Sequence, residues 1–281
     1  MSKGVKVSVI MPSYNEEKRI EACFNRVVEA LRNYGETFEI ILEEDGSTDN
    51  TPEIIDMIAK KYSFVEAIHH PGRMGKGFGV RKCLERAKGE FIVLIDSDLE
   101  YPPERIPDLL SSIDGADIVV GARYMWRNIT NSKTRRVRAI ASDVYGFIIR
   151  TLFDFHEPVD IQSGFKAFRR RTIESISPLT SNGFEIDSEI LIKGQRKGFI
   201  ISCIPVTYTY KGNSKVNILL DPMKMLFSIL EWKANGKFDA RKGETEHNTE
   251  HMPVIDFSRK LQGSTVVTKE PAVRGEEGKG N

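Results

Sequence analysis

Short apolar segments alternate with helix-like segments along the chain as far as Val120. Each apolar segment has the length of a buried strand, and acidic or proline-containing helix starts follow. The expected strands are residues 5–11, 38–42, 65–68 and 91–95, and the expected helices cover residues 15–33, 51–62, a stretch ending near 88, and a segment opening at 102. Repeated units of this kind predict an α/β fold with a mostly parallel central sheet and helices on both faces.

The composition argues against several classes of protein. The 281 residues include 41 Lys and Arg against 40 Asp and Glu, a formal net charge of +1, which argues against a nucleic-acid partner. The cysteines Cys23, Cys83 and Cys203 leave one unpaired in any disulfide scheme and lack metal-ligand spacing. The sequence shows neither a secretory signal nor a long apolar run, so we expect a cytoplasmic protein.

The second half of the chain is less regular. Basic residues concentrate in the segment 123–150, and apolar residues recur at helical spacing over 137–153, which predicts an amphipathic basic helix. A second apolar stretch covers 218–232. These two segments either pack on the sheet or lie as amphipathic helices in a membrane interface. We expect one domain over residues 1–238 and a polar, weakly ordered tail over 239–281.

Two aspartates directly follow the most apolar strand. Asp96 and Asp98 alternate around Ser97, so in extended chain both carboxylates point to one side, and Glu100 continues the alternation. Carboxylate oxygens suit Mg²⁺ or Mn²⁺, which complete their coordination with substrate phosphates. The alternative is that these acids only cap the next helix.

Further candidates follow the first two strands. Asp45 lies at the carboxyl end of a strand, where a carboxylate can accept hydrogen bonds from a base or ribose, whereas Asp49 fits a turn or helix cap. Pro12 stiffens the loop after the first strand, and Tyr14 has a ring that can stack on a base. Taken by itself, this loop after the first strand is better explained as an ordinary strand-to-helix turn.

A glycine-rich run over residues 72–79 resembles a phosphate-binding P-loop but does not match the residue pattern of that motif. His70 stands where the first glycine of that motif belongs, and Gly77 replaces the Ser or Thr after the lysine. The dinucleotide pattern also fails, because Lys82 stands where its last glycine belongs. The run therefore favours neither an ATPase nor a dehydrogenase, and we expect a flexible loop that brings Lys76 near a diphosphate.

The motifs together have a familiar order. The series is P-S-Y-N-E at 12–16, E-D-G-S-T-D-N-T at 44–51, G-K-G-F-G at 75–79 and D-S-D-L-E-Y-P-P-E at 96–104. It closely resembles the inverting family 2 glycosyltransferases with a GT-A (Rossmann-like) fold. The later motifs resemble the dolichyl-phosphate mannose synthase branch: G-A-R-Y at 121–124, Q-S-G-F-K-A-F at 162–168, G-F-E-I-D at 183–187, and G-N-S-K at 212–215, where that branch has G-E-S-K. The resemblance covers roughly residues 5 to 235.

The resemblance implies a donor site and a metal site. It implies that Asp45 contacts the nucleoside and that Asp96 and Asp98 hold Mg²⁺ or Mn²⁺ on the donor diphosphate. Glu100, where many relatives carry Gln, would be the third metal-site residue. The implied nucleotide-sugar site comprises Pro12, Tyr14, Glu16, Asp45, Lys76, Asp96 and Gln162.

The resemblance also implies a set of catalytic residues. Arg123 matches the branch's phosphate-contacting arginine, and Arg138 with Ser142 best matches its Arg-x-x-x-Ser pair. The late cationic contact would be Lys211 or Lys215. The implied catalytic residues are Asp98, Arg123, Arg138, Ser142, Lys211 and Lys215.

From these residues we expect a metal-dependent inverting hexosyltransferase. The donor would be GDP-mannose or UDP-glucose and the acceptor dolichyl or another polyprenyl phosphate, which the basic stretch 123–138 favours. The oxyanion of such an acceptor needs no general base. A glycan hydroxyl would need one, with Glu185 or Asp187 as candidates.

Two alternatives remain, because many relatives carry transmembrane helices that this sequence does not show. One is a glycosyltransferase acting on a glycan hydroxyl, and the other is a non-catalytic nucleotide-sugar-binding subunit of a membrane complex. Retention of Asp45, Asp96 and Asp98 together argues against the second. For a lipid acceptor we expect peripheral attachment to the cytoplasmic face of a membrane, or a membrane partner protein.

Overall fold

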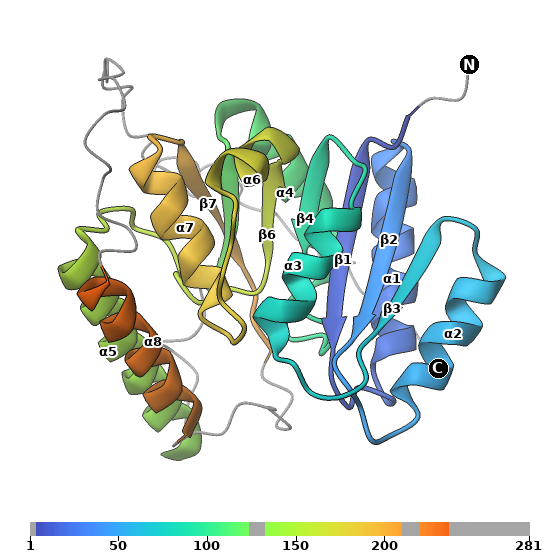
Figure 1. Cartoon of the computed structure of the whole chain (residues 1–281). Coiled ribbons are helices and arrows are strands. Elements are labelled where there is room, and N and C mark those ends of the chain that lie inside the picture. The colour runs from blue at the N-terminus through green and yellow to red at the C-terminus, as the bar shows by residue number, and fades with distance from the viewer. Residues whose placement is uncertain (1–3, 124–132, 210–219, 236–281) are drawn as a thin grey trace, which may run out of the picture. The chain divides into compact units, whose positions relative to one another are not determined.

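The computed structural model describes the backbone of residues 4–123, 133–209 and 220–235, with the side chains of 133–141 and 220–223 left out. The expected tail at 239–281 lies outside the described residues, so the proposed domain division stays a prediction. Figure 1 shows a central sheet with helices on both faces. The strands are β1 Val7–Ser13, β2 Phe38–Glu44, β3 Val65–His69, β4 Phe91–Leu94, β5 Ile118–Arg123, β6 Lys166–Arg169 and β7 Ile201–Val206.

The helices alternate with these strands along most of the chain. They are α1 Ile20–Tyr34, α2 Thr51–Lys61, α3 Lys76–Arg86, α4 Ile106–Ser112, α5 Lys133–Phe153, α6 Arg170–Ile176, α7 Ile186–Arg196 and α8 Leu220–Ala234, with short 3₁₀ turns at Pro103–Arg105 and Ile113–Gly115. None of the helices in the described part of the chain is both long and apolar enough to span a bilayer.

The sheet is mixed, with strand order β3-β2-β1-β4-β6-β5-β7. Only β6 runs antiparallel to its neighbours β4 and β5, and the other pairs are parallel. The expectation of a mostly parallel α/β sheet is confirmed. The carboxyl ends of β1, β2 and β4 therefore meet at one edge, where ligands bind in such sheets.

Each face of the sheet has its own hydrophobic core, because side chains alternate along every strand. In β1, Val9 belongs to the core that includes residues of α1, α2 and α4, whereas its neighbour Ile10 belongs to the core that includes residues of α3 and α5–α8. The same alternation places Val93 in the first core and Leu94 in the second. These strands read as continuous apolar runs because both faces are covered.

Three helix boundaries differ from the expectations. Helix α1 begins at Ile20 rather than near Asn15, because Asn15 adopts a φ of 55°, outside the helical region. Helix α3 begins at Lys76, so the glycine run is not a flexible loop throughout: its second half forms the first helical turn. Residues 220–234 form one helix despite Pro222, because proline is tolerated in a first turn.

Candidate active site

The sequence-predicted residues gather at the carboxyl edge of the parallel strands. Pro12 is paired with Glu43 near the end of the β1–β2 ladder. Its carbonyl accepts a hydrogen bond from Ser97 Oγ at 2.9 Å. Asp45 follows β2 directly, and its backbone N–H bonds Ser13 O at 3.0 Å. The loops after β1, β2 and β4 are therefore connected, and the acidic motifs face one shared region.

Asp45 organises the loop that covers this region. Its carboxylate accepts backbone N–H groups from Met74 at 2.6 Å and Gly75 at 3.0 Å. Burial raises the pKa of Asp45, while these two N–H groups oppose the rise. The loop approaches so closely that a Cβ on Gly46 would lie 2.3 Å from the carbonyl carbon of Gly72. Only glycine fits at position 46, where φ is also 68°.

Tyr14 and Glu16 flank the same edge. The guanidinium of Arg73 lies 4.4 Å from the centroid of the Tyr14 ring, a cation–π contact that fixes the orientation of the ring. Glu16 is buried and forms a two-point ion pair with Arg19, at 2.6 and 2.9 Å. Glu16 therefore enters the site already paired, which gives it a structural role in shaping the loop after β1.

Lys76 lies at the centre of a buried chain of alternating charges. Its Nζ is 2.8 Å from Asp96 Oδ1 and 3.0 Å from Asp187 Oδ2. The other oxygen of Asp187 accepts from the fully buried Lys166 at 2.6 Å. Burial alone would lower the pKa of Lys76, but the carboxylates of Asp187 and Asp96 outweigh it and raise that pKa. The ammonium of Lys76 is thus held by ion pairs rather than carried on a mobile loop.

Asp98 and Glu100 lie beside Asp96 in a region of excess negative charge. Asp98 accepts the backbone N–H of Glu100 at 2.9 Å, around Leu99, whose φ is 59°. Burial, then the charges of Asp96 and Glu100, raise the pKa of Asp98 to about 8. A cation bound between these carboxylates would stabilise their ionised forms.

These carboxylates fit a divalent cation that a substrate completes. No group of three or more His, Cys, Asp or Glu side chains in the described residues forms a ready-made metal cage. Asp96 contacts Lys76, and Glu100 accepts a hydrogen bond from the hydroxyl of Tyr208. The oxygen donors and their excess charge suit Mg²⁺ or Mn²⁺ held by one or two carboxylates plus phosphate oxygens. A three-residue metal set including Glu100 stays a prediction.

A second cluster is centred on Arg123, at the end of β5. Arg123 donates to both oxygens of Asp160, at 2.8 Å for the Nη2–Oδ1 pair, and Nη2 also lies 3.3 Å from Ser142 Oγ. Ser142 in turn donates to Gln162 Oε1 at 2.6 Å. The burial of Asp160 favours a higher pKa, but Arg123 outweighs it and lowers that pKa. The structure thus brings three predicted residues, Arg123, Ser142 and Gln162, into contact.

Tyr208 connects the two clusters. Its hydroxyl donates to Glu100 of the carboxylate cluster, and its ring lies 5.5 Å from the guanidinium of Arg123. Tyr101 packs edge-on against the same ring, with centroids 5.2 Å apart. The carboxylate cluster and the arginine cluster therefore belong to one site.

Three functional candidates were missed by sequence reasoning: Asp160, Lys166 and Tyr208. Lys166 is the lysine of the Q-S-G-F-K motif, which therefore carried a signal for it, whereas Asp160 lies two positions before that motif. Tyr208 lies in no motif. Of the predicted residues, the side chain of Arg138 and all of Lys211 and Lys215 lie outside what the structure describes.

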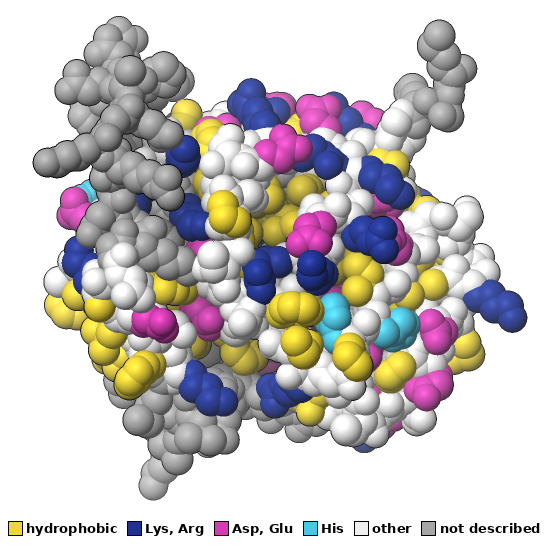
Figure 2. All heavy atoms as spheres, in the orientation of Figure 1, with side chains coloured by type: hydrophobic (Ala, Val, Ile, Leu, Met, Phe, Trp, Pro, Cys, Tyr) yellow, Lys and Arg dark blue, Asp and Glu magenta, His cyan; other side chains and the backbone are white. Residues whose placement is uncertain are grey.

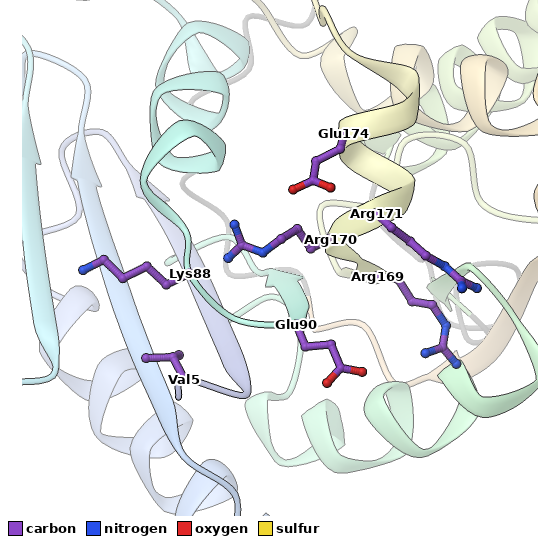
Figure 3. A pocket seen from close by; sticks show the side chains of 7 residues that line it. All are labelled: Val5, Lys88, Glu90, Arg169, Arg170, Arg171 and Glu174. Atoms are coloured by element: carbon purple, nitrogen blue, oxygen red, sulfur yellow. The ribbon is translucent and has the colours of Figure 1, made fainter. Parts of the chain in front are cut away.

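A separate hollow of about 420 Å³ lies at the amino-terminal edge of the sheet (Figure 3). Three of its cationic lining residues bond to protein groups, although Arg170 Nη2 has no hydrogen-bond partner. Arg169 donates to Ile113 O at 2.8 Å, Arg171 pairs with Asp117 at 3.2 Å, and Arg170 donates to Gly89 O at 2.9 Å. In Figure 3 the side chains of Arg169 and Arg171 extend away from that of Arg170. The hollow therefore offers no converging anion site.

The architecture and the acidic edge define a GT-A type of α/β protein. Glucosyl-3-phosphoglycerate synthase from Mycobacterium tuberculosis, solved with Mn²⁺, UDP and phosphoglyceric acid, superposes with a TM-score of 0.65 at 20% identity, covering 82% of this chain and 78% of that one. This likeness shows the fold.

The sequence comparisons then give the family. Residues 8–177 match the family described as glycosyl transferase family 2, and the chain belongs to that family. AglD, a glycosyltransferase of Haloferax volcanii, is 33% identical over 81% of this chain, and a dolichol-phosphate mannosyltransferase of Pyrococcus furiosus is 31% identical over 82%. The matches span only 37% and 65% of those two relatives.

Proposed function

We propose that this chain transfers a hexose from a nucleotide diphosphate sugar to a polyprenyl phosphate such as dolichyl phosphate. The observation that carries the proposal is the contact of an acidic cluster with an arginine cluster through Tyr208. The names of the relatives support it, since a protein of Saccharomyces cerevisiae that is 30% identical is a dolichyl-phosphate β-glucosyltransferase. With the mannosyltransferase of Pyrococcus furiosus, this leaves GDP-mannose and UDP-glucose as donors to test.

The acidic cluster is the proposed donor side. Asp96 and Asp98 would hold Mg²⁺ or Mn²⁺, which supplies positive charge to the diphosphate as it leaves. The Mn²⁺ of the mycobacterial structure supports a divalent ion in this fold. Asp45 and the N–H groups of the loop that it organises, Met74 and Gly75, would border the nucleoside.

The arginine cluster is the proposed acceptor side. Arg123, already oriented by Asp160 and Ser142, would bind the phosphate of the lipid and align its oxygen with the sugar. That oxygen is ionised near neutral pH, so no general base is needed, and one displacement inverts the sugar. Asp187 is unsuited as a base for a hydroxyl acceptor, because Lys76 and Lys166 occupy both its oxygens.

Helices α5 and α8, which lie side by side in Figure 1, are the proposed membrane contact. Each carries two exposed apolar residues at a spacing of three: Val144 and Phe147 on α5, and Phe227 and Leu230 on α8. Hydrophobic side chains gather over these helices at the left of Figure 2. Such faces suit insertion into the headgroup region of a membrane. We therefore propose peripheral attachment to the cytoplasmic face, directly or beside a membrane partner protein.

Replacing an exposed phenylalanine on these helices with aspartate tests the membrane contact. Phe147 and Phe227 are 70% and 77% exposed, so Phe147→Asp and Phe227→Asp should leave the fold intact. Burying a phenylalanine side chain is worth about 2 kcal/mol, so each change should weaken vesicle binding at least about tenfold in a sedimentation assay. Met57→Asp, on α2 at 64% exposure, is the matched control. Unchanged sedimentation of both phenylalanine variants would rule out this surface.

Replacing Gly164 with alanine tests the position of Asp96. A Cβ at Gly164 would lie 1.8 Å from Asp96 Oδ2, so the carboxylate has to move. We expect Gly164→Ala to fold normally but to raise the KM for the donor and the metal requirement about tenfold, because a misplaced ligand weakens metal and donor binding. Gly115→Ala, where a Cβ meets nothing within 4 Å, should behave as wild type. Normal kinetics of Gly164→Ala would show that the carboxylate position is unimportant.

The acceptor class is tested by comparing three acceptors with one labelled donor. The acceptors are dolichyl phosphate, dolichol without its phosphate, and a soluble mannose oligosaccharide. We expect product only from the phosphate, because Arg123 suits an anionic acceptor and Lys76 and Lys166 occupy the candidate base Asp187. Product from the oligosaccharide would move the assignment to a glycan-hydroxyl transferase.

A further inference from the structure

The ammonium of Lys76 occupies the carboxylate of Asp96. Lys76 Nζ lies 2.8 Å from Asp96 Oδ1, and its side chain is only 10% exposed. Asp96 is also fixed on its other side, since its Oδ2 lies against the Cα of Gly164, where no Cβ would fit. One oxygen of the proposed metal ligand Asp96 therefore already contacts an internal cation.

A second ion pair, with Asp187, also holds the side chain of Lys76 in position. Asp187 accepts from Lys76 at 3.0 Å and from the fully buried Lys166 at 2.6 Å. Lys166 also donates to the carbonyl of Ser163, in the loop that carries Gly164. Asp187 thus keeps its own buried cation, Lys166, when Lys76 moves, and the carboxylate that Lys76 leaves is Asp96, which is 27% exposed and open to another cation.

We propose that Lys76 is a built-in counter-cation that competes with the divalent metal for Asp96. The proposal rests on the proposed function for the metal itself, but assigns Lys76 a role beyond donor contact. In the absence of donor, the ammonium neutralises Asp96 and weakens metal binding. When the donor diphosphate is present, it offers Lys76 a new anionic partner while Asp187 keeps hold of the side chain.

Metal and nucleotide therefore bind cooperatively through Lys76. Metal and nucleotide each bind better to the state in which the ammonium has left Asp96. Each therefore increases the affinity for the other by the same factor. Removing the positive charge should tighten metal binding in the absence of nucleotide and reduce the gain that nucleotide brings. A lysine that only stabilises the fold would produce neither change.

The test is a titration of Mn²⁺ that follows the free ion by electron paramagnetic resonance, with and without GDP or UDP. Lys76→Met removes the charge at similar length, and Lys76→Gln retains hydrogen-bond donors for both carboxylates should the methionine variant fold poorly. Lys76→Arg keeps the charge. Lys82→Met, in an exposed pair with Glu85 on the same helix, is the matched control.

Without nucleotide, we expect the methionine and glutamine variants to bind Mn²⁺ about tenfold more tightly than wild type, because a nearby like charge is gone. Lys76→Arg and Lys82→Met should match wild type. Unchanged or weaker Mn²⁺ binding in both neutral variants would overturn the competition. A wild-type protein that binds no Mn²⁺ even with nucleotide, while Lys76→Met binds none either, would instead contradict the metal role in the proposed function.

Discussion

Replacing Asp98 with asparagine is expected to reduce sugar transfer by about 100- to 1000-fold, the usual effect of removing one group that stabilises a developing negative charge. Asp98 lies two residues from Asp96, and the charges of Asp96 and Glu100 act on its carboxylate, so a cation bound there would relieve their repulsion. The amide has similar size but cannot balance a divalent ion on the diphosphate. Initial rates at saturating donor and acceptor, with Mn²⁺ added, measure the loss.

The same variant has a readout that does not depend on activity. Burial and neighbouring carboxylates raise the pKa of Asp98 to about 8, from 3.8 in the unfolded chain, so the folded state holds its proton more tightly. Stability from this group is present at low pH and is lost as pH rises from about 4 to about 8. In metal-free buffer, Asp98→Asn should therefore have a higher Tm than wild type at pH 8 and an equal Tm near pH 4.

The control for Asp98 is a surface aspartate. Asp108 on α4 has a side chain that is 48% exposed, and it pairs at 2.8 Å with Arg105 of the preceding 3₁₀ turn. Asp108→Asn should keep wild-type transfer and a wild-type pH dependence of Tm. Full activity of Asp98→Asn would exclude a role for its carboxylate at the diphosphate.

Replacing Arg123 with methionine should reduce transfer to polyprenyl phosphate by about 100-fold or more, because the proposed charge-assisted contact with the acceptor phosphate is lost. Donor binding should not change, since Arg123 lies in the cluster with Asp160 and Ser142 rather than on the loop around Asp45. Equilibrium binding of GDP and UDP, measured beside the steady-state kinetics, separates the two effects. A loss of nucleotide affinity equal to the loss of transfer would contradict the assignment of Arg123 to the acceptor.

Stability has to be separated from function at this position. Arg123→Met leaves Asp160, whose side chain is 15% exposed, without its main cation. Removing one partner of a buried ion pair lowers the free energy of unfolding by about 3–5 kcal/mol. The double variant Arg123→Met with Asp160→Asn should recover most of that stability and none of the activity. Arg26→Met, which breaks an exposed pair with Glu104, is the matched single-arginine control.

The sheet could be predicted because the strands have both faces buried. Apolar runs such as residues 91–95 carry a strong local signal, and proline and acidic residues mark the helix starts at Thr51 and Pro103. The antiparallel position of β6 had no such signal. It is fixed by pairing with β4 and β5, which lie far away in sequence.

The charges of the site were harder to predict than its location. Strand ends and motif order located Asp45, Asp96 and Asp98 at one edge, but a sequence does not state which cation faces which anion. Lys76 was expected on a flexible loop, and the structure places it in a helical turn between two carboxylates. The second of these, Asp187, lies 111 positions further along the chain.

Transfer by the purified chain is the most direct measurement of the central claim. The assay incubates radiolabelled GDP-mannose or UDP-glucose with dolichyl phosphate, Mn²⁺ and mild detergent, and counts label extracted into organic solvent. We predict label in the organic phase with one donor, and its loss when a chelator is added or when dolichol replaces dolichyl phosphate. Label that stays in intact donor with both sugars, from a folded protein with Mn²⁺ present, would contradict the proposed transfer to a lipid phosphate.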